Sequence, residues 1–227
     1  MLTKLFIFYL LTLLLGNPFL ALLVLVLLYL AADVRYFGWT RRAADAFWAE
    51  KEIRDLFRQV DLNPSNAPAS TELGRLLVQR GRYSQALPHL ERAIERAEDS
   101  PETNYYLGLA LLHSERKPEG ERRILMSLDI NPRFRYGEPY FRLGESLLDQ
   151  GRAKEAAALL QKGVNIHSSS TEGWYLLGKA YQALGSREAA RDAMNQAIQA
   201  FRQSPAYKRR AERRFAWKAR WARRELL

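Results

Sequence analysis

The chain has 227 residues, with 35 lysines and arginines against 25 aspartates and glutamates, and it has no cysteine. The lack of cysteine excludes a disulfide framework, thiolate zinc sites, a cysteine nucleophile and a lipoprotein anchor. The formal charge of +10 is uneven, because residues 201–227 carry ten cations and two glutamates, a net +8, which leaves +2 for the rest. An inference about partners from net positive charge therefore applies to residues 201–227 alone.

The N-terminal segment is strongly apolar. Residues 5–32 contain no charged side chain, and Gly16-Asn17-Pro18 is the one strong interruption. As one helix this run would measure about 42 Å, whereas the apolar core of a bilayer is about 30 Å thick. It predicts a hydrophobic membrane anchor over residues 1–35, either a single span kinked at Pro18 or a hairpin of two short helices. A cleaved signal peptide ending near Asp33 is the alternative, but the run is about twice the usual length.

Positive charge around this segment predicts its orientation. Lys4 precedes the apolar run, and four cations follow it: Arg35, Arg41, Arg42 and Lys51. Tyr36, Phe37 and Trp39 stand where interfacial aromatic residues are found. Because flanking cations favour the cytoplasmic side, we expect an inner (cytoplasmic) membrane protein whose soluble domain faces the cytoplasm.

A repeat of about 34 residues follows the anchor. Four segments align on a Leu-Gly pair, with glycines at Gly74, Gly108, Gly144 and Gly178, spaced 34, 36 and 34 residues apart. A small residue stands twelve positions after each glycine, and a large apolar residue follows four positions later. These pairs are Ala86 and Leu90, Gly120 and Ile124, Ala156 and Leu160, and Ala190 and Met194. Small residues let two helices approach closely, so the pattern predicts stacked helical hairpins.

The fourth segment carries Trp174, Leu177, Gly178 and Tyr181 in the order W-x2-L-G-x2-Y. This pattern resembles the tetratricopeptide repeat (TPR), and with the apolar segment the chain is similar to membrane-anchored TPR proteins. The resemblance implies an all-α fold, an N-terminal transmembrane anchor plus an α-solenoid of about four repeats with capping helices. The expected parts are a capping helix or half-repeat over residues 40–66, the repeats over 67–204, and a basic C-terminal capping helix over 205–227.

The entry to the third unit is irregular. Residues 133–140 include two extra positions between Pro132 and the next helix, with Gly137 and Pro139 among them. A longer loop is the simpler interpretation, and a functional insertion is the alternative.

The resemblance also implies a concave groove, lined by the first helix of each unit, that binds a segment of a partner protein. Its fifth positions are Thr71, Tyr105, Phe141 and Tyr175, and its ninth positions are Arg75, Leu109, Glu145 and Lys179. The three aromatic residues predict a stripe of binding anchors, unless their rings pack against neighbouring helices. The Lys/Asn clamp that some members use for acidic C-termini is not matched, so we expect an extended or helical segment instead.

The last predicted helix alternates cations with aromatic residues. Its predicted basic surface consists of Lys208, Arg209, Arg210, Arg213, Arg214, Trp217, Lys218 and Trp221. Such a surface suits anionic lipid or a partner protein, and it also suits the phosphates of a nucleic acid. A solvated cap is the plain alternative. The N-terminal anchor favours lipid contact, and nucleic acid is the least expected partner.

The sequence carries no catalytic pattern that we recognise. The histidines His89, His113 and His167 lie in different repeats without metal-ligand spacing. No phosphate loop, nucleophile elbow or zinc motif accompanies them. We therefore expect a scaffold or adaptor for protein-protein interaction, not an enzyme, with no cofactor and no metal.

Overall fold

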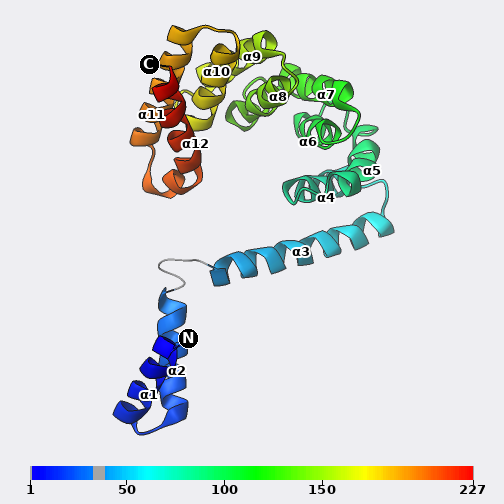
Figure 1. The fold of residues 1–227 in the computed structure, drawn as a ribbon. Helices are drawn as coiled ribbons and strands as arrows, with labels where there is room; N and C mark the ends of the chain where they lie inside the picture. The colour runs from blue at the N-terminus through cyan, green and yellow to red at the C-terminus, as the bar shows by residue number, and fades with distance from the viewer. Residues whose placement is uncertain (1, 33–38, 227) are drawn as a thin grey trace. The chain divides into compact units, whose positions relative to one another are not determined.

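The structure, a computed structural model, describes residues 2–32 and 39–226, and the side chains at 6, 8–29 and 44–226. Every regular element in this part of the chain is a helix (Figure 1). Residues up to Asp55 and residues from Leu56 onward form two compact units, which are described separately. The elements are α1 (Leu2–Leu15), α2 (Pro18–Ala32), α3 (Trp39–Leu62), α4 (Ala67–Gln79), α5 (Tyr83–Ile94), α6 (Pro101–Leu112), α7 (Lys117–Ile130), the 3-10 turn η2 (Phe134–Gly137), α8 (Glu138–Asp149), α9 (Ala153–Ile166), α10 (Thr171–Ala183), α11 (Arg187–Gln203) and α12 (Ala206–Glu225).

The first unit begins with two apolar helices, α1 and α2, that fold back on each other (Figure 1). After α1, Gly16 adopts the left-handed conformation at φ +65°. The Asn17 side chain then accepts a hydrogen bond from the backbone N–H of Phe19 at 2.9 Å, and Pro18 is the first residue of α2. A left-handed glycine ends a helix, whereas an asparagine cap followed by proline starts one, so the chain turns here.

The expected single span kinked at Pro18 is therefore wrong, because the chain turns back between two short helices. α1 and α2 have 14 and 15 residues. At the usual rise each is about 22 Å long or less, short of the roughly 30 Å of a bilayer core. Within residues 2–32 and 39–226, no helix combines the length and the apolarity needed to cross a membrane. The two helices have the arrangement of the hairpin alternative.

Several sequence predictions fall outside the described residues. Arg35, Tyr36 and Phe37, the expected start of the interfacial belt, lie there, as does the expected cleavage point beside Asp33. α3 runs through the predicted capping segment. Its last turns belong to the second unit, where the ring of Phe57 meets His89 edge-on, with 5.3 Å between ring centroids.

Four helical hairpins, α4–α5, α6–α7, α8–α9 and α10–α11, stack into an arc in the second unit (Figure 1). The first helix of each hairpin lies on the inner side of the arc and the second on the outer side. The aligned glycines mark the crossing within each hairpin. A Cβ on Gly74 would lie 2.4 Å from Cγ of Leu90, and one on Gly144 would lie 2.5 Å from Cγ of Leu160. The helices therefore cross too closely for any side chain at these positions.

Polar residues fix where the inner helices begin. Asn66, Ser100 and Ser170 each accept a hydrogen bond from the backbone N–H three residues on, at 3.0, 3.2 and 3.0 Å. These caps satisfy N–H groups that have no partner within the helix.

The entry to α8 breaks this pattern. Arg135, Tyr136 and Gly137 all have positive φ, at +47°, +54° and +79°. The irregular segment ends at Gly137, so Pro139 and Tyr140, expected in a loop, form the first turn of α8 instead. A left-handed backbone is unfavourable for arginine and tyrosine, so side-chain contacts must hold the turn.

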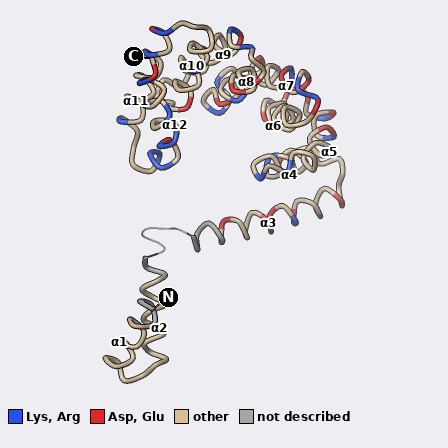
Figure 2. Tube along the Cα trace, viewed as in Figure 1, with Lys and Arg blue, Asp and Glu red and all other residues tan. Residues whose placement is uncertain are grey.

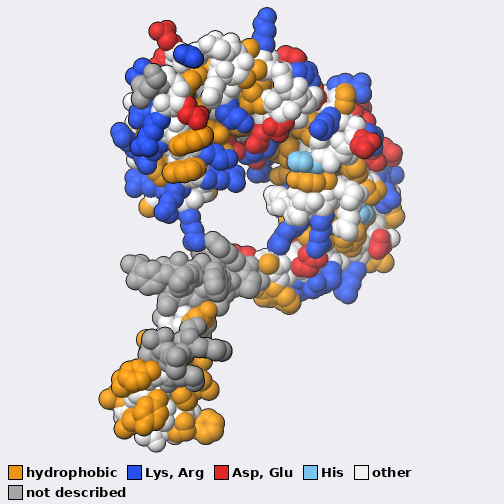
Figure 3. All heavy atoms as spheres, in the orientation of Figure 1, with side chains coloured by type: hydrophobic (Ala, Val, Ile, Leu, Met, Phe, Trp, Pro, Cys, Tyr) orange, Lys and Arg blue, Asp and Glu red, His pale blue; other side chains and the backbone are white. Residues whose placement is uncertain are grey.

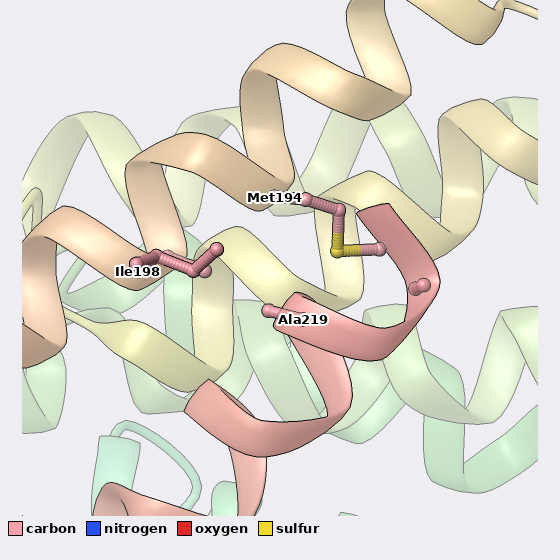
Figure 4. Close-up of a cluster of buried hydrophobic side chains, with 5 residues drawn as sticks. Met194, Ile198 and Ala219 are labelled. Atoms are coloured by element: carbon pink, nitrogen blue, oxygen red, sulfur yellow. The ribbon is translucent and has the colours of Figure 1, made fainter. Parts of the chain in front are cut away.

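α12 closes the array by packing on α10 and α11. Ala219 and Ala222 lie in a buried cluster with Met194, Ala197 and Ile198 of α11 (Figure 4). The small side chains allow the two helices to approach closely.

One acid on the buried side of α12 also holds this helix in place. Glu212 accepts hydrogen bonds from the hydroxyls of Thr171 at 2.9 Å and Ser204 at 2.7 Å. Lys208, one turn earlier, pairs with the same carboxylate at 3.1 Å. Because a buried carboxylate needs these hydrogen bonds, Glu212 fixes the position and the rotation of α12 against the array.

Candidate partner-binding groove

Three adjacent hollows line the inner side of the array, with volumes of about 290, 340 and 320 Å³. The first lies between α4, α6 and α8, the second between α6 and α8, and the third between α8, α10 and α12. Arg142 lines all three, Leu109 and Glu145 line the first two, and Arg135 and Glu138 line the first and third. Because neighbouring hollows share walls, we treat them as one groove.

The structure places the predicted ninth positions at different depths. Leu109 is half-buried and Glu145 half-exposed, and both line the groove. Arg75 is half-buried on α4 and forms an ion pair with Glu72, which raises the pKa of its guanidinium. Lys179 is exposed on α10 and lines none of the three hollows.

The predicted aromatic stripe is mostly core. Tyr105 and Phe141 are 1% and 3% exposed. Phe141 fills the space beside Gly163 and Gly173, where an added Cβ would lie 2.6 and 2.5 Å from its ring. Tyr175 is half-buried and packs its ring against Phe215 at 5.9 Å between centroids. The rings of Tyr105 and Phe141 thus form the floor of the groove, which is the packing alternative raised from the sequence.

The first hollow is rich in aromatic rings. Tyr83 and His113 stack face to face across its mouth, with 4.0 Å between centroids and 10° between planes. Tyr105 and Tyr106 form its floor, and the hydroxyl of Tyr105 is buried without a hydrogen-bond partner. Burial, and then the negative charge of Glu138, raise the pKa of Tyr105, so this hydroxyl stays protonated. A buried hydroxyl without a partner costs free energy that a bound polar group would recover.

Arg142 is the electrostatic centre of the groove. Its guanidinium bonds Glu145 at 3.0 Å and Glu172 at 2.8 Å, and Glu138 lies 3.8 Å away. Arg135 bonds the same Glu138 at 2.7 Å. Two cations thus face three carboxylates, which leaves the centre of the groove with one net negative charge.

The predicted basic surface divides into two faces of α12. Lys208 and Arg214 turn toward the groove and line its third hollow, and Arg214 lies 4.5 Å from the ring of Phe215. Arg209 donates to the backbone carbonyl of Ser204 at 2.8 Å. Lys218 lies 5.9 Å from the ring of Tyr175. These four cations therefore have contacts within the chain.

The other members of the basic surface face outward. Trp217 and Trp221 are 67% and 58% exposed, and Arg210 and Arg213 are exposed beside them. Lysine and arginine positions recur along the tube at α12 (Figure 2), and blue side chains gather in the same part of the space-filling view (Figure 3). The outward face is therefore cationic with two exposed indole rings.

The described residues contain no group of three or more histidines, aspartates or glutamates placed to hold a metal ion. The three histidines remain far apart in the array, each against an aromatic ring: His89 with Phe57, His113 with Tyr83, and His167 with Phe141. Burial lowers the pKa of each imidazole, so the neutral form is favoured.

Comparison with known proteins agrees with this architecture. Models of the tetratricopeptide repeat match residues 71–125 and residues 147–211. The TPR repeat-containing protein PA0015 of Pseudomonas aeruginosa is 39% identical over 80 residues, which are 35% of this chain and 71% of that protein. The chain belongs to the tetratricopeptide repeat family.

Solved TPR structures share the fold. The crystal structure of MamA superposes with a TM-score of 0.63 at 19% identity, over 76% of this chain and 93% of MamA. YrrB, described as a TPR protein with an unusual peptide-binding site, superposes with a TM-score of 0.60 at 19% identity, over 82% of this chain and 90% of YrrB. These similarities confirm the expected all-helical TPR solenoid.

The TPR register missed the residues that carry most of the charge in the groove. Arg142, Glu138 and Glu172 stand at neither the fifth nor the ninth position, and Arg135 lies in the irregular turn. One signal was present, since Glu138, Arg142 and Glu145 are spaced i, i+4 and i+7 on one helix face. The pairing of Arg142 with Glu172 joins two different repeats, so no spacing within one helix could have revealed it.

Proposed function

We propose that this TPR protein is a membrane-attached, non-enzymatic scaffold whose groove binds an extended or helical segment of a partner protein. The main support is the run of three connected hollows on the inner side, where side chains of α4, α6, α8, α10 and α12 converge. YrrB, which has a similar fold, is described as having a peptide-binding site. The groove offers rings for anchoring and charges of both signs for register.

Site-specific crosslinking in intact cells tests where the partner binds. A photoreactive phenylalanine derivative replaces Leu109 in the groove, and in a matched variant it replaces Leu125, which is 40% exposed on the outer helix α7. We expect Leu109 to crosslink to a defined segment of a partner, identified by mass spectrometry of the joined peptides. The same partners recovered at both positions, or none at Leu109, would contradict binding in the groove.

Membrane attachment is proposed for the α1–α2 hairpin. Its apolar side chains point outward, with Leu13, Leu14 and Phe19 exposed at 68%, 79% and 82%. Such a surface is unstable in water and stable in the apolar region of a bilayer. A hairpin of short helices would enter and leave by one face, which keeps the repeats on a single side.

The proposed location is the inner membrane, with the repeats in the cytoplasm. Arg41, Arg42 and Lys51 follow the hairpin, and positive charge favours that side. The lack of native cysteine makes a clean test available, because a single Ser65→Cys, at an exposed position after α3, is the only thiol. We expect a membrane-impermeant maleimide to label it in inverted inner-membrane vesicles but not in intact spheroplasts. Labelling in spheroplasts would place the repeats on the opposite side.

Anionic lipid is the second candidate ligand, for the outward face of α12. Exposed Trp217 and Trp221 beside Arg210 and Arg213 are the observation that favours it. Indole rings prefer the membrane interface, and each nearby cation adds about 1 kcal/mol at an anionic surface.

Quenching by brominated lipid in nanodiscs measures this contact. In discs of anionic lipid, tryptophan fluorescence should be quenched more in the native chain than in a Trp217→Ala, Trp221→Ala variant. Trp48→Ala, which removes an equally exposed indole on α3, is the control. Equal quenching in discs of zwitterionic lipid would contradict the electrostatic part. Salt-sensitive binding of RNA or DNA without any quenching would favour nucleic acid instead.

A further inference from the structure

The irregular turn before α8 places Arg135, whose side chain is 39% exposed, in the wall of the first hollow of the groove. Arg135 donates from Nε to Glu138 at 2.7 Å and from Nη1 to the hydroxyl of Tyr106 at 3.0 Å. Its guanidinium carbon also lies 5.9 Å from the centre of the Tyr106 ring. These three groups, the ring, the hydroxyl and the carboxylate, therefore make a subsite that already binds a guanidinium. We call Tyr105, Tyr106 and Glu138 the arginine subsite.

Arg135 occupies this subsite against its backbone preference. Both Arg135 and the following Tyr136 adopt a left-handed backbone, at φ +47° and +54°. Non-glycine residues avoid this conformation, and where it persists it often marks a functional segment. This turn contains the two residues by which the third unit exceeds the regular repeat spacing. The irregular segment is therefore the one that brings the Arg135 side chain to the groove.

The arginine subsite has a hydroxyl group and an adjacent hollow that Arg135 does not use. Tyr105 lines the same hollow, and its hydroxyl is buried without a partner. The hollow of about 290 Å³ beside it is walled by the stacked rings of Tyr83 and His113. Removing Arg135 would leave Arg142 facing Glu138, Glu145 and Glu172, a deficit of positive charge that an incoming cation would offset.

Arginine fits these groups better than lysine does. Its planar fork bonds a hydroxyl and a carboxylate at once and stacks on aromatic rings, whereas an ammonium group is a single, strongly hydrated point of charge. A guanidinium also has five N–H donors, enough for the unpartnered hydroxyl of Tyr105 as well.

We propose that the arginine subsite receives an arginine side chain of the bound partner segment, and that Arg135 is an internal occupant which this arginine displaces. The inference rests on the proposed function, because it names the chemistry of the segment that the groove binds. Arg135 thereby lowers the apparent affinity of the groove for segments that carry an arginine in register, because its side chain must first leave the subsite.

Binding of peptide pools to the full chain in detergent micelles tests the inference. The probes are fluorescent pools of short peptides with random flanks and a fixed central arginine, lysine, glutamine or glutamate. Arg135→Gly empties the subsite, and glycine suits the left-handed backbone. We expect it to tighten binding of the arginine pool about threefold or more, because the subsite no longer has to be vacated. The glutamine and glutamate pools should bind as they bind the native chain.

Three further variants serve as controls. Arg133→Gly removes an exposed arginine two residues earlier, outside the three hollows of the groove, and should leave all pools unchanged. Adding Glu138→Gln to Arg135→Gly should cancel the gain for arginine. Arg135→Ala, which keeps the backbone restricted, should tighten the arginine pool as Arg135→Gly does, and thermal unfolding of each variant shows that the array is folded.

The outcomes separate the inference from the proposed function. Pools that bind without preference for arginine, and that lose binding when Leu109→Trp fills the groove, would overturn the arginine subsite and leave groove binding intact. Equal effects of the Arg133 and Arg135 variants would overturn the role of Arg135 as the occupant. If no pool bound the native chain or Arg135→Gly, groove binding itself would fail, and the subsite with it.

Discussion

The N-terminal hairpin and the repeat hairpins use the same turn but treat their apolar side chains in opposite ways. Gly16 joins α1 to α2 at φ +65°, and Gly81, Gly151 and Gly185 join repeat helices at φ +72° to +75°. In the repeats, leucines such as Leu77 and Leu90 are fully buried.

In the α1–α2 hairpin Ala21 is the buried hydrophobic side chain among those described, and large residues point outward. A repeat hairpin covers its apolar face by stacking on the next, whereas the described part of the first unit offers no second hairpin to stack on. The comparison shows that a turn at a left-handed glycine occurs in both kinds of hairpin. The role of a hairpin depends instead on what covers its apolar face. The comparison predicts that added charge weakens membrane attachment of the α1–α2 hairpin, whereas added side-chain volume destabilises the repeat hairpins.

The largest expected effect is that of charge on the α1–α2 hairpin. Leu14→Arg together with Phe19→Arg should cost about 5 kcal/mol of membrane partitioning, since each arginine at the centre of an apolar segment costs about 2.5 kcal/mol or more. The measurement is the fraction of the chain that sediments with membranes. Leu62→Arg, at a leucine 88% exposed on α3, is the control and should change nothing. Sedimentation unaffected by both hairpin charges would contradict membrane attachment through α1 and α2.

Added side-chain volume at the helix crossings should destabilise the repeats. A Cβ on Gly108 would lie 2.9 Å from the carbonyl oxygen of Gly120 and 3.0 Å from the backbone nitrogen of Ile124, atoms that cannot move aside. On Gly178 it would meet the flexible end of Met194 at 2.7 Å. We expect Gly108→Ala to lower the free energy of unfolding by about 3 kcal/mol and Gly178→Ala by about 1 kcal/mol. Urea unfolding followed by circular dichroism measures both, and equal losses would show that the α6–α7 crossing can relax.

The buried carboxylate of Glu212 provides a test of how α12 is held against α10 and α11. Glu212→Ala removes the carboxylate that accepts from the hydroxyl of Thr171 and leaves Ser204 only the carbonyl of Ala200 at 3.0 Å, which should cost about 2 kcal/mol of unfolding free energy. Glu225→Ala, at an exposed position on the same helix, should have no measurable effect. An unchanged melting temperature in Glu212→Ala would mean that α12 is held by its alanine face alone.

The smallest expected effect is a difference in pH response between the two regions. Burial holds the pKa of His89, His113 and His167 below the ordinary value, so the unfolded chain takes up protons before the folded array does. The histidine contribution to stability is therefore present above about pH 6.5 and is lost as the pH falls below it. Residues 2–32 contain no histidine, aspartate or glutamate.

We thus expect thermal unfolding of the array to shift down between pH 7 and pH 5, while membrane sedimentation stays constant. His89→Gln should remove part of the shift, because its Nδ1 is buried without a partner and its ring contacts Phe57. A shift of equal size in the triple glutamine variant of His89, His113 and His167 would assign the acid response to the carboxylates instead.

The aligned glycines show how far sequence reasoning could reach. Gly74, Gly108, Gly144 and Gly178 recur because helices cross there, and an added Cβ at each would lie less than 3.0 Å from an atom of the facing helix. The break at Gly16-Asn17-Pro18 was visible too, but the sequence left its consequence open between a kinked span and a hairpin. Proline within a helix predicts a kink, whereas proline after a capping asparagine starts a new helix, and the two differ in only a few backbone angles.

The groove could be predicted in place but not in detail. Of the positions predicted from the family register, Leu109 and Glu145 line the hollows, whereas the stacked repeats bury the rings of Tyr105 and Phe141. Partner binding at these positions stays a prediction. Nothing in the sequence marks Arg135 as left-handed or directs it to Tyr106, 29 residues away. Such contacts depend on how neighbouring repeats pack, which a pattern along one helix does not contain.

By itself the sequence determined the helical class, the repeat period, the apolar N-terminus and the basic end, because each depends on local spacing and composition. Tertiary structure alone decided which aromatic rings form the floor of the groove and which are exposed, how Arg142 pairs with carboxylates from two repeats, and that Arg135 contacts Tyr106 at the first hollow. The physical reason is that burial and ion pairing are properties of surfaces brought together by stacking, and one chain pattern is compatible with several such arrangements until the repeats dock.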